Sequence, residues 1–173
     1  MASKSSTTAC QAAWNPDQQP IPFANPWGRP GAYTTMLVDG DPPTPLFLDR
    51  HLRRLKKCLG HLGLPEIFRD AFLEESILET ASGINTVPCM LRTAVVPEGL
   101  FITAYPQSGK GARLHGRLCK IRRKLPAAKS LLDISLHEEM QTVNRNREEL
   151  LLVSPDGHVL EGATTNLLFV RGK

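Results

Sequence analysis

The sequence predicts an α+β fold divided into two units, and three observations support this prediction. Runs of β-branched and apolar residues, as at 31–38 and 90–96, are typical of strands, whereas leucines recur at helical spacing at 48–62. A polar, glycine-bearing segment then separates these elements from a second series. The 173 residues, 41% hydrophobic and 22% charged, suffice for one good core or two small ones. We expect an irregular segment at 1–28, a small α+β domain at 29–106, a linker at 107–113 and part of a larger domain at 114–173.

The first domain is predicted to open with two strands. Residues 1–28 are rich in Pro, Gln and Asn, which favours irregular structure. The β-rich run at 31–38 ends at a cluster of turn residues at 39–43. A short second strand is expected at 45–48.

Two helices and two further strands complete this domain. An amphipathic helix is predicted at 48–62 from leucines at three- and four-residue steps, namely Leu48, Leu52, Leu55, Leu59 and Leu62. A second helix is expected at 65–82, because a proline in the first turn and nearby acids suit a helix start. Strands follow at 90–96 and 100–105, joined by the turn at 97–99.

The second unit is predicted to mix strands with one helix. We expect a strand at 114–122, a helix at 130–144 and strands at 149–154, 159–160 and 166–170. A Pro-Asp-Gly turn separates the second of these strands from the third. Together these elements form an α+β unit.

Composition excludes several classes of protein and leaves others open. The net charge of +4 suits a nucleic-acid binder, but equally a pocket for phosphorylated or carboxylated small molecules. The cysteines are widely spaced, with no metal-ligand pattern, so we predict reduced thiols and no metal site. No apolar run reaches the length of a membrane span, and the first nine residues lack the apolar core of a secretory signal, so together with the reduced thiols we expect a cytoplasmic protein. A short organelle-targeting segment at the acid-free N-terminus is the alternative.

Lys129 and Glu161 together point to one cofactor chemistry. A lysine can hold an aldehyde cofactor as a Schiff base, and a carboxylate can keep a pyridine nitrogen protonated. Taken alone, Lys129 follows a basic run and would be a solvated surface lysine. Glu161 alone would be an acid at the end of a strand, but the Thr164-Thr165-Asn166 cluster after it favours function.

Four segments in a fixed order carry a family resemblance. They are Gly31-Ala32-Tyr33, His51-Leu52-Arg53-Arg54-Leu55, Lys129-Ser130-Leu131, and the segment 160–170 with its E-G-x-x-x-N pattern. They resemble the class IV aminotransferases, a pyridoxal-phosphate group that includes branched-chain and D-amino-acid aminotransferases and aminodeoxychorismate lyase. The resemblance runs from about residue 31 to 170. It implies the D-amino-acid aminotransferase-like fold, with a small N-terminal domain and an incomplete large domain.

The resemblance also implies residue roles. Lys129 would form the Schiff base and then move a proton between the substrate Cα and the cofactor. Glu161 would face the pyridine nitrogen, and Arg54 would meet the phosphate of pyridoxal 5'-phosphate. The implied cofactor contacts are Arg54, Lys129, Glu161, Thr164 and Thr165, and the implied substrate contacts are Tyr33 and Arg92.

Structural explanations compete with three of these roles. Arg54 lies in a helix rich in basic residues, where charges usually form a solvated face. Tyr33 alternates along a strand and suits a core position equally well. Arg92 lies between apolar strand residues, so we expect it to have a partner, because an unpaired buried charge is costly.

A basic stretch between 113 and 124 is not explained by the enzyme hypothesis. It contains Arg113, Arg117, Lys120, Arg122, Arg123 and Lys124. Clustered cations can bind a phosphate backbone, but this stretch lacks interleaved aromatic residues. We favour a solvated edge strand protected by charge, and we expect no nucleic-acid partner.

The substrate is not determined by these motifs. Branched-chain enzymes tend to carry a tyrosine shortly after the Schiff-base lysine, where this chain has 131–134, Leu-Leu-Asp-Ile. D-amino-acid enzymes use an Arg and a His after the strand that holds Arg92, and neither is found at 95–99. Both the amino acid and its stereochemistry therefore stay open.

Relatives continue for about a hundred residues beyond the E-G-x-x-x-N motif, the size of a further domain. We therefore expect a fragment or truncated form of an aminotransferase that uses an amino acid and a 2-oxo acid, a homodimer at full length. One alternative is a carbon–carbon lyase of the same family. Others are an inactive homologue that serves as a dimerisation partner, and a basic binding module without a cofactor.

Overall fold

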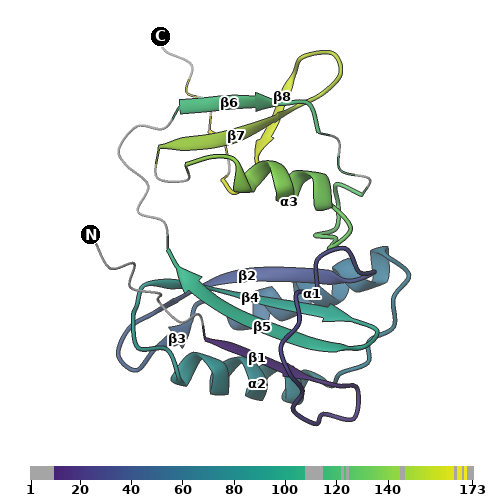
Figure 1. Cartoon of the computed structure of the whole chain (residues 1–173), viewed down its shortest axis with the longest axis vertical. Coiled ribbons are helices and arrows are strands. Elements are labelled where there is room, and N and C mark those ends of the chain that lie inside the picture. Colours follow the sequence, from purple (N-terminus) through teal and green to yellow (C-terminus); the bar gives the residue numbers. More distant parts are fainter. Residues whose placement is uncertain are drawn as a thin grey trace, which may run out of the picture. The chain divides into compact units, whose positions relative to one another are not determined.

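The computed structural model describes residues 10–107, 115–121, 123, 125–144, 147–165, 167, 168 and 170. These residues form two compact units (Figure 1). The first unit comprises 10–107 and 125–132, and the second comprises the described residues of 115–124 and 133–170. Among the described residues, no helix is long and apolar enough to cross a membrane.

The first unit is built on an antiparallel five-stranded sheet. Its strands are β1 (Gln11–Trp14), β2 (Ala32–Asp39), β3 (Thr44–Pro45), β4 (Cys89–Val96) and β5 (Gly99–Pro106). They lie in the order β1-β5-β4-β2-β3. The expectation of an irregular segment at 1–28 is wrong at β1, which pairs with β5 from Gln11 to Trp14. β1 is a strand because it pairs with β5 at the edge of the sheet, and the turn-rich sequence around it gives no sign of that pairing.

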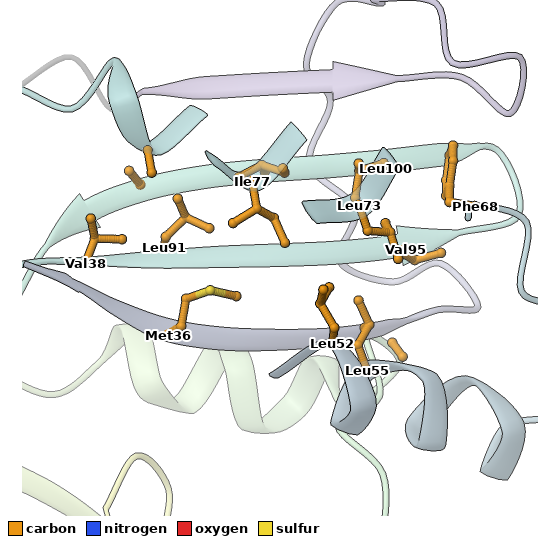
Figure 2. Close-up of a cluster of buried hydrophobic side chains, with 14 of the residues drawn as sticks. Met36, Val38, Leu52, Leu55, Phe68, Leu73, Ile77, Leu91, Val95 and Leu100 are labelled. Atoms are coloured by element: carbon orange, nitrogen blue, oxygen red, sulfur yellow. The ribbon is translucent and has the colours of Figure 1, made fainter. Parts of the chain in front are cut away.

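Two helices cover one face of this sheet. They are α1 (Leu48–His61) and α2 (Asp70–Ser82). Figure 2 shows the core beneath them, where Leu52 and Leu55 of α1 and Ile77 of α2 lie among side chains of the strands. All three are nearly or completely buried. Burial of these apolar side chains against the sheet is the main stabilisation of the two helices.

Helix α2 begins five residues later than the sequence predicts. Phe68, which is 5% exposed, precedes the helix, and its ring stacks on that of Phe72 at a centroid distance of 5.5 Å. Arg69 is extended, with φ −69° and ψ 151°. The segment 65–69 thus remains outside the helix and carries Phe68 into the core.

The opposite face of the sheet has a smaller apolar cluster. Ala94, Phe101 and Leu131 are buried there, and Phe23 and Trp27 of the segment before β2 pack against them. Phe23 and Phe101 meet edge to face at 5.9 Å. The chain before β2 therefore packs on this face, although it is not in a helix or strand.

The segment 125–132 belongs to the first unit, although the sequence assigns it to the second domain. The short strand β3 pairs with β2 at Val38 and Asp39. The start of β2 therefore has a free edge on the side where β3 lies. Ser130 forms an antiparallel bridge with Ala32 at this free edge, and the Leu131 N–H donates to the Gly31 carbonyl at 3.0 Å. The helix expected from residue 130 therefore begins later, at Ile134.

The second unit has a three-stranded sheet and one helix. Its strands β6 (His115–Cys119), β7 (Glu148–Val153) and β8 (Val159–Gly162) lie in that order, with β6 parallel and β8 antiparallel to β7. Helix α3 (Ile134–Gln141) packs Leu136 and Met140 against Cys119, Leu150 and Leu152. Most of the expected linker, and Asn166 and Phe169 of the last expected strand, lie outside the described residues.

Candidate active site

Lys129 lies at the free edge of β2, and both its main-chain carbonyl and its main-chain N–H form hydrogen bonds. Its carbonyl accepts a 3.0 Å hydrogen bond from the Tyr33 N–H, and its own N–H donates to Cys58 Sγ at 3.4 Å. Lys129 Nζ lies 5.3 Å from the centroid of the Tyr33 ring, within the range of a cation–π contact. These main-chain hydrogen bonds fix the backbone position from which the half-buried Lys129 side chain extends.

Helix α1 places His51 within electrostatic range of both Arg54 and Lys129. His51 Nδ1 lies 2.8 Å from Thr34 Oγ1. Burial lowers the pKa of His51, and the positive charges of Arg54 and Lys129 lower it further. Arg54 itself is exposed. The imidazole is therefore biased towards its neutral form beside two cations.

Arg92 is surrounded by aromatic rings. Its guanidinium carbon lies 5.3 Å from the ring centroid of Trp27, 5.7 Å from that of Tyr33 and 5.1 Å from that of Tyr105. Nη2 donates to the Tyr105 hydroxyl at 3.2 Å. Nε is buried and has no hydrogen-bond partner among the described residues. The expected partner of Arg92 is therefore this aromatic group, and one donor remains unsatisfied.

These residues lie on the half-exposed face of the sheet. Tyr33 and Thr35 alternate with buried residues of β2, and Arg92 lies opposite Thr35 in β4. Tyr105 follows on β5, and all four side chains are partly exposed. A cationic, aromatic surface of this kind suits a planar or carboxylated ligand.

The second unit holds the other three site residues that the sequence predicts. Glu161 lies on β8 opposite Leu152, and its Oε1 is 3.5 Å from Arg123 Nη1. The side chain of Arg123 is 11% exposed, whereas that of Glu161 is 44% exposed. Thr164 and Thr165 follow β8 in the next loop. The carboxylate of Glu161 is thus partly open to solvent and has a cationic neighbour in Arg123.

The loop after β8 is closely packed. A Cβ on Gly162 would collide with Thr165 Oγ1, so the glycine permits the loop to turn back here. The Thr164 N–H donates to Glu149 Oε1 at 2.8 Å, and its hydroxyl lies 2.9 and 3.1 Å from the two oxygens of that carboxylate. Glu149 is 7% exposed.

Two described arginines of the basic stretch are paired with acids. Arg117 bonds Glu139 and Thr142, and Arg123 pairs with Glu161. Among the strands that the structure describes, β6 is at the edge of its sheet, as the sequence predicts. Arg113, Arg122 and Lys124 lie outside the described residues. The described residues contain no group of three or more His, Cys, Asp or Glu side chains placed to hold a metal ion.

Sequence reasoning gives no role to five residues of these clusters. They are Trp27, His51, Cys58, Tyr105 and Glu149. Glu149 has a sequence signal, because it is an acid beside the apolar run of β7, where a buried charge needs partners. Trp27 lies in a turn-rich stretch, and no periodicity indicates which face of the sheet it covers.

The amino-transferase class IV family matches residues 31–173. The fold is similar to that of a branched-chain amino acid aminotransferase from T.th., complexed with N-(5'-phosphopyridoxyl)-L-glutamate. The TM-score is 0.64 and the identity 19%, and the match covers 88% of this chain and 61% of that one. A hypothetical aminotransferase from Mycobacterium tuberculosis, in its PLP-bound form, is similar with a TM-score of 0.57 and 18% identity. The match covers 88% of this chain and 65% of that one. At these identities the likeness shows the fold alone.

A structure described as a putative 4-amino-4-deoxychorismate lyase is also similar, with a TM-score of 0.56 and 25% identity over 85% of this chain and 64% of that one. A comparison with curated protein sequences found no match. The chain thus spans less than two thirds of the length of these solved structures.

Proposed function

The chain belongs to the amino-transferase class IV family, and on that premise we propose that it is a pyridoxal-phosphate-dependent protein, or part of one, that transfers an amino group from an amino acid to a 2-oxo acid. One observation carries the proposal. Lys129, which is partly buried, is fixed through its main chain at a sheet edge, its amine lies over Tyr33, and both Lys129 and Arg54 lower the pKa of His51.

The donor set suits pyridoxal phosphate. When bound, this cofactor supplies an aldehyde that condenses with an amine and a protonated ring that accepts electrons from the substrate. The first unit offers the amine of Lys129 and, on α1, the exposed guanidinium of Arg54 for a phosphate. The second unit offers the carboxylate of Glu161 for the ring nitrogen, with Thr165 in the loop after it. The solved structures lend support, since two are described with this cofactor or its adduct.

Lys129 has two tasks in this mechanism. Its amine would hold the cofactor, and once released it would carry a proton between the substrate Cα and the cofactor. The hydrogen bonds to Tyr33 and Cys58 hold the base of the side chain, which reduces the freedom lost when the amine is aimed. The neutral His51 beside it adds no third positive charge to this neighbourhood.

Tyr33 and Arg92 are proposed to contact the substrate. Arg92 is partly exposed, so its guanidinium can pair with a carboxylate, and the rings of Trp27 and Tyr105 hold the guanidinium in place. Substrates that carry a carboxylate are therefore favoured.

An absorbance titration tests the proposal. Purified chain mixed with pyridoxal phosphate should develop a visible-edge band, which borohydride reduction converts to a stable adduct on Lys129, located by mass spectrometry. Lys129→Ala should lose both the band and the adduct. Lys57→Ala removes an exposed lysine of α1 and should keep both. A folded chain without the band would refute the proposal that this chain by itself holds the cofactor.

A lyase of the same family is the second candidate, because a structure described as a putative 4-amino-4-deoxychorismate lyase matches at 25% identity. The two reactions differ in what they consume. An aminotransferase needs a 2-oxo acid to complete its cycle, whereas a lyase turns over a single amine substrate. Turnover of 4-amino-4-deoxychorismate without any 2-oxo acid would favour the lyase.

We also propose that the functional protein is a homodimer. Sedimentation of the purified chain tests this point directly. Co-elution of an inactive chain with a full-length relative would instead favour a dimerisation partner.

A further inference from the structure

Glu149 is a buried acid that the proposed mechanism does not use. It lies on β7 among apolar residues and is 7% exposed. Its Oε1 accepts the Thr164 N–H at 2.8 Å, and the Thr164 hydroxyl lies 3.1 Å from Oε1 and 2.9 Å from Oε2. Both carboxylate oxygens are thus engaged by one residue of the loop after Glu161.

This arrangement has an energetic reason. A carboxylate in a strand core loses its hydration, and charge-assisted hydrogen bonds must offset that loss. The Thr164 hydroxyl donates its single proton to the Glu149 carboxylate. That proton is then not available to a phosphate or to any other acceptor.

The backbone register shows what the contact does. In the antiparallel pair β7 and β8, Glu161 lies opposite Leu152 and Gly162 opposite Leu151. The Ala163 N–H then donates to the Leu150 carbonyl at 2.8 Å. Thr164 is the next residue, and the Glu149 carboxylate takes its N–H. The side chain of Glu149 therefore ends the ladder and holds the loop three residues after Glu161.

We propose that Glu149 is a positioning residue for the loop that follows Glu161, and that Thr164 acts through this contact rather than by donating to the cofactor. The inference rests on the proposed function only for its second half. The hydrogen bonds to Glu149 determine the path of the loop in the chain without cofactor.

Amide hydrogen exchange, measured by NMR on the chain without cofactor, tests the first half. In Glu149→Leu, which keeps the volume but removes the acceptor, the Thr164 amide should exchange at least about tenfold faster. The Ala163 amide and the amides shared by β6 and β7 should change less than about twofold. Glu149→Gln retains one acceptor oxygen and should give an intermediate rate.

Glu148 provides the matched control. It is the neighbouring acid of the same strand, and its Oε2 accepts the Asn144 N–H at 2.8 Å. Glu148→Leu should leave the Thr164 amide unchanged. An equal rate at Thr164 in the wild-type chain and in Glu149→Leu would overturn the proposal, as would a uniform increase across β7, which would indicate general destabilisation.

Binding of pyridoxal phosphate tests the second half. Thr164→Val and Glu149→Leu should weaken binding by a similar factor. Weaker binding in Thr164→Val with normal binding in Glu149→Leu would mean that the hydroxyl contacts the cofactor directly, against the proposal. If the wild-type chain binds no pyridoxal phosphate, the proposed function fails, and the exchange rates alone still decide the positioning role.

Discussion

Tyr33 and Lys129 are 96 positions apart in the sequence and meet twice in the structure. The Tyr33 N–H donates to the Lys129 carbonyl at 3.0 Å, and Lys129 Nζ lies 5.3 Å from the centroid of the Tyr33 ring. One residue of the sheet therefore both anchors the lysine and contacts its amine. The expected catalytic group is thereby attached to the larger of the two described sheets.

The pKa of His51 should report the charge of Lys129. Burial, Arg54 and Lys129 lower this pKa, in that order of size. Lys129→Met removes one positive charge, so the pKa of His51 should rise. An NMR titration of the His51 ring protons measures it, with the exposed Lys57→Met as control. The same pKa in both variants would contradict the proximity of His51 and Lys129.

Stability should fall in mild acid because of His51. Its pKa in the folded chain is below the ordinary value of 6.5. Between the folded value and 6.5 the unfolded chain binds the proton more readily, so the free energy of unfolding decreases as the pH falls through that window. Above it this contribution is absent. Urea unfolding from pH 7.5 to 5 should show a shallower decline in His51→Gln, whereas the exposed His61→Gln should follow the wild type.

Gly31 should not tolerate a side chain. A Cβ there would lie 2.6 Å from the Val95 carbonyl oxygen, 2.6 Å from Val96 Cγ1 and 2.7 Å from Leu131 Cδ1. Gly31→Ala should therefore lower the free energy of unfolding by about 1–3 kcal/mol and loosen the 125–132 segment. Gly60, in α1, has nothing within 4 Å of such an atom.

The matched change Gly60→Ala should stabilise the chain by roughly 0.5–1 kcal/mol, because alanine is the better helix former. Urea unfolding of both variants gives the comparison. Equal effects of the same sign at both glycines would show that the close contacts of Gly31 carry no cost.

The ion pair between Arg123 and Glu161 should contribute little to stability. Its atoms are 3.5 Å apart, and the Glu161 side chain is 44% exposed. A double-mutant cycle with Arg123→Gln and Glu161→Gln should therefore give a coupling below about 1 kcal/mol. A larger coupling would mean that Glu161 is a structural acid, and loss of cofactor binding in Glu161→Gln would then not report the ring nitrogen.

Local patterns predict part of this fold well. Leucine spacing predicts α1 because it marks the buried stripe directly, and the alternation in β2 marks its two faces. The start of α2 and the length of α3 are not predicted. Phe68 is held in the core before α2, and Ser130 is held by β2, so both boundaries depend on contacts distant in sequence.

The candidate site divides in the same way. Motif order indicates Arg54, Lys129 and Glu161, because each belongs to a segment with a recognisable pattern. Trp27, Tyr105 and Glu149 have no such pattern. Trp27 and Tyr105 contact Arg92, which is 65 and 13 positions away, and Glu149 contacts Thr164, which is 15 positions away. Side-chain contacts of this range follow from the folded sheet.

Residue types and their spacing are sufficient to identify the family and the order of its motifs. The place of Lys129 in the first unit, in contrast, depends on contacts that form in the folded chain. The free edge of β2 has main-chain donors and acceptors that must be paired, and the fold brings the segment 125–132 to that edge. Spacing along the chain carries no record of that pairing, since it places Lys129 nearer to Glu161 than to Tyr33.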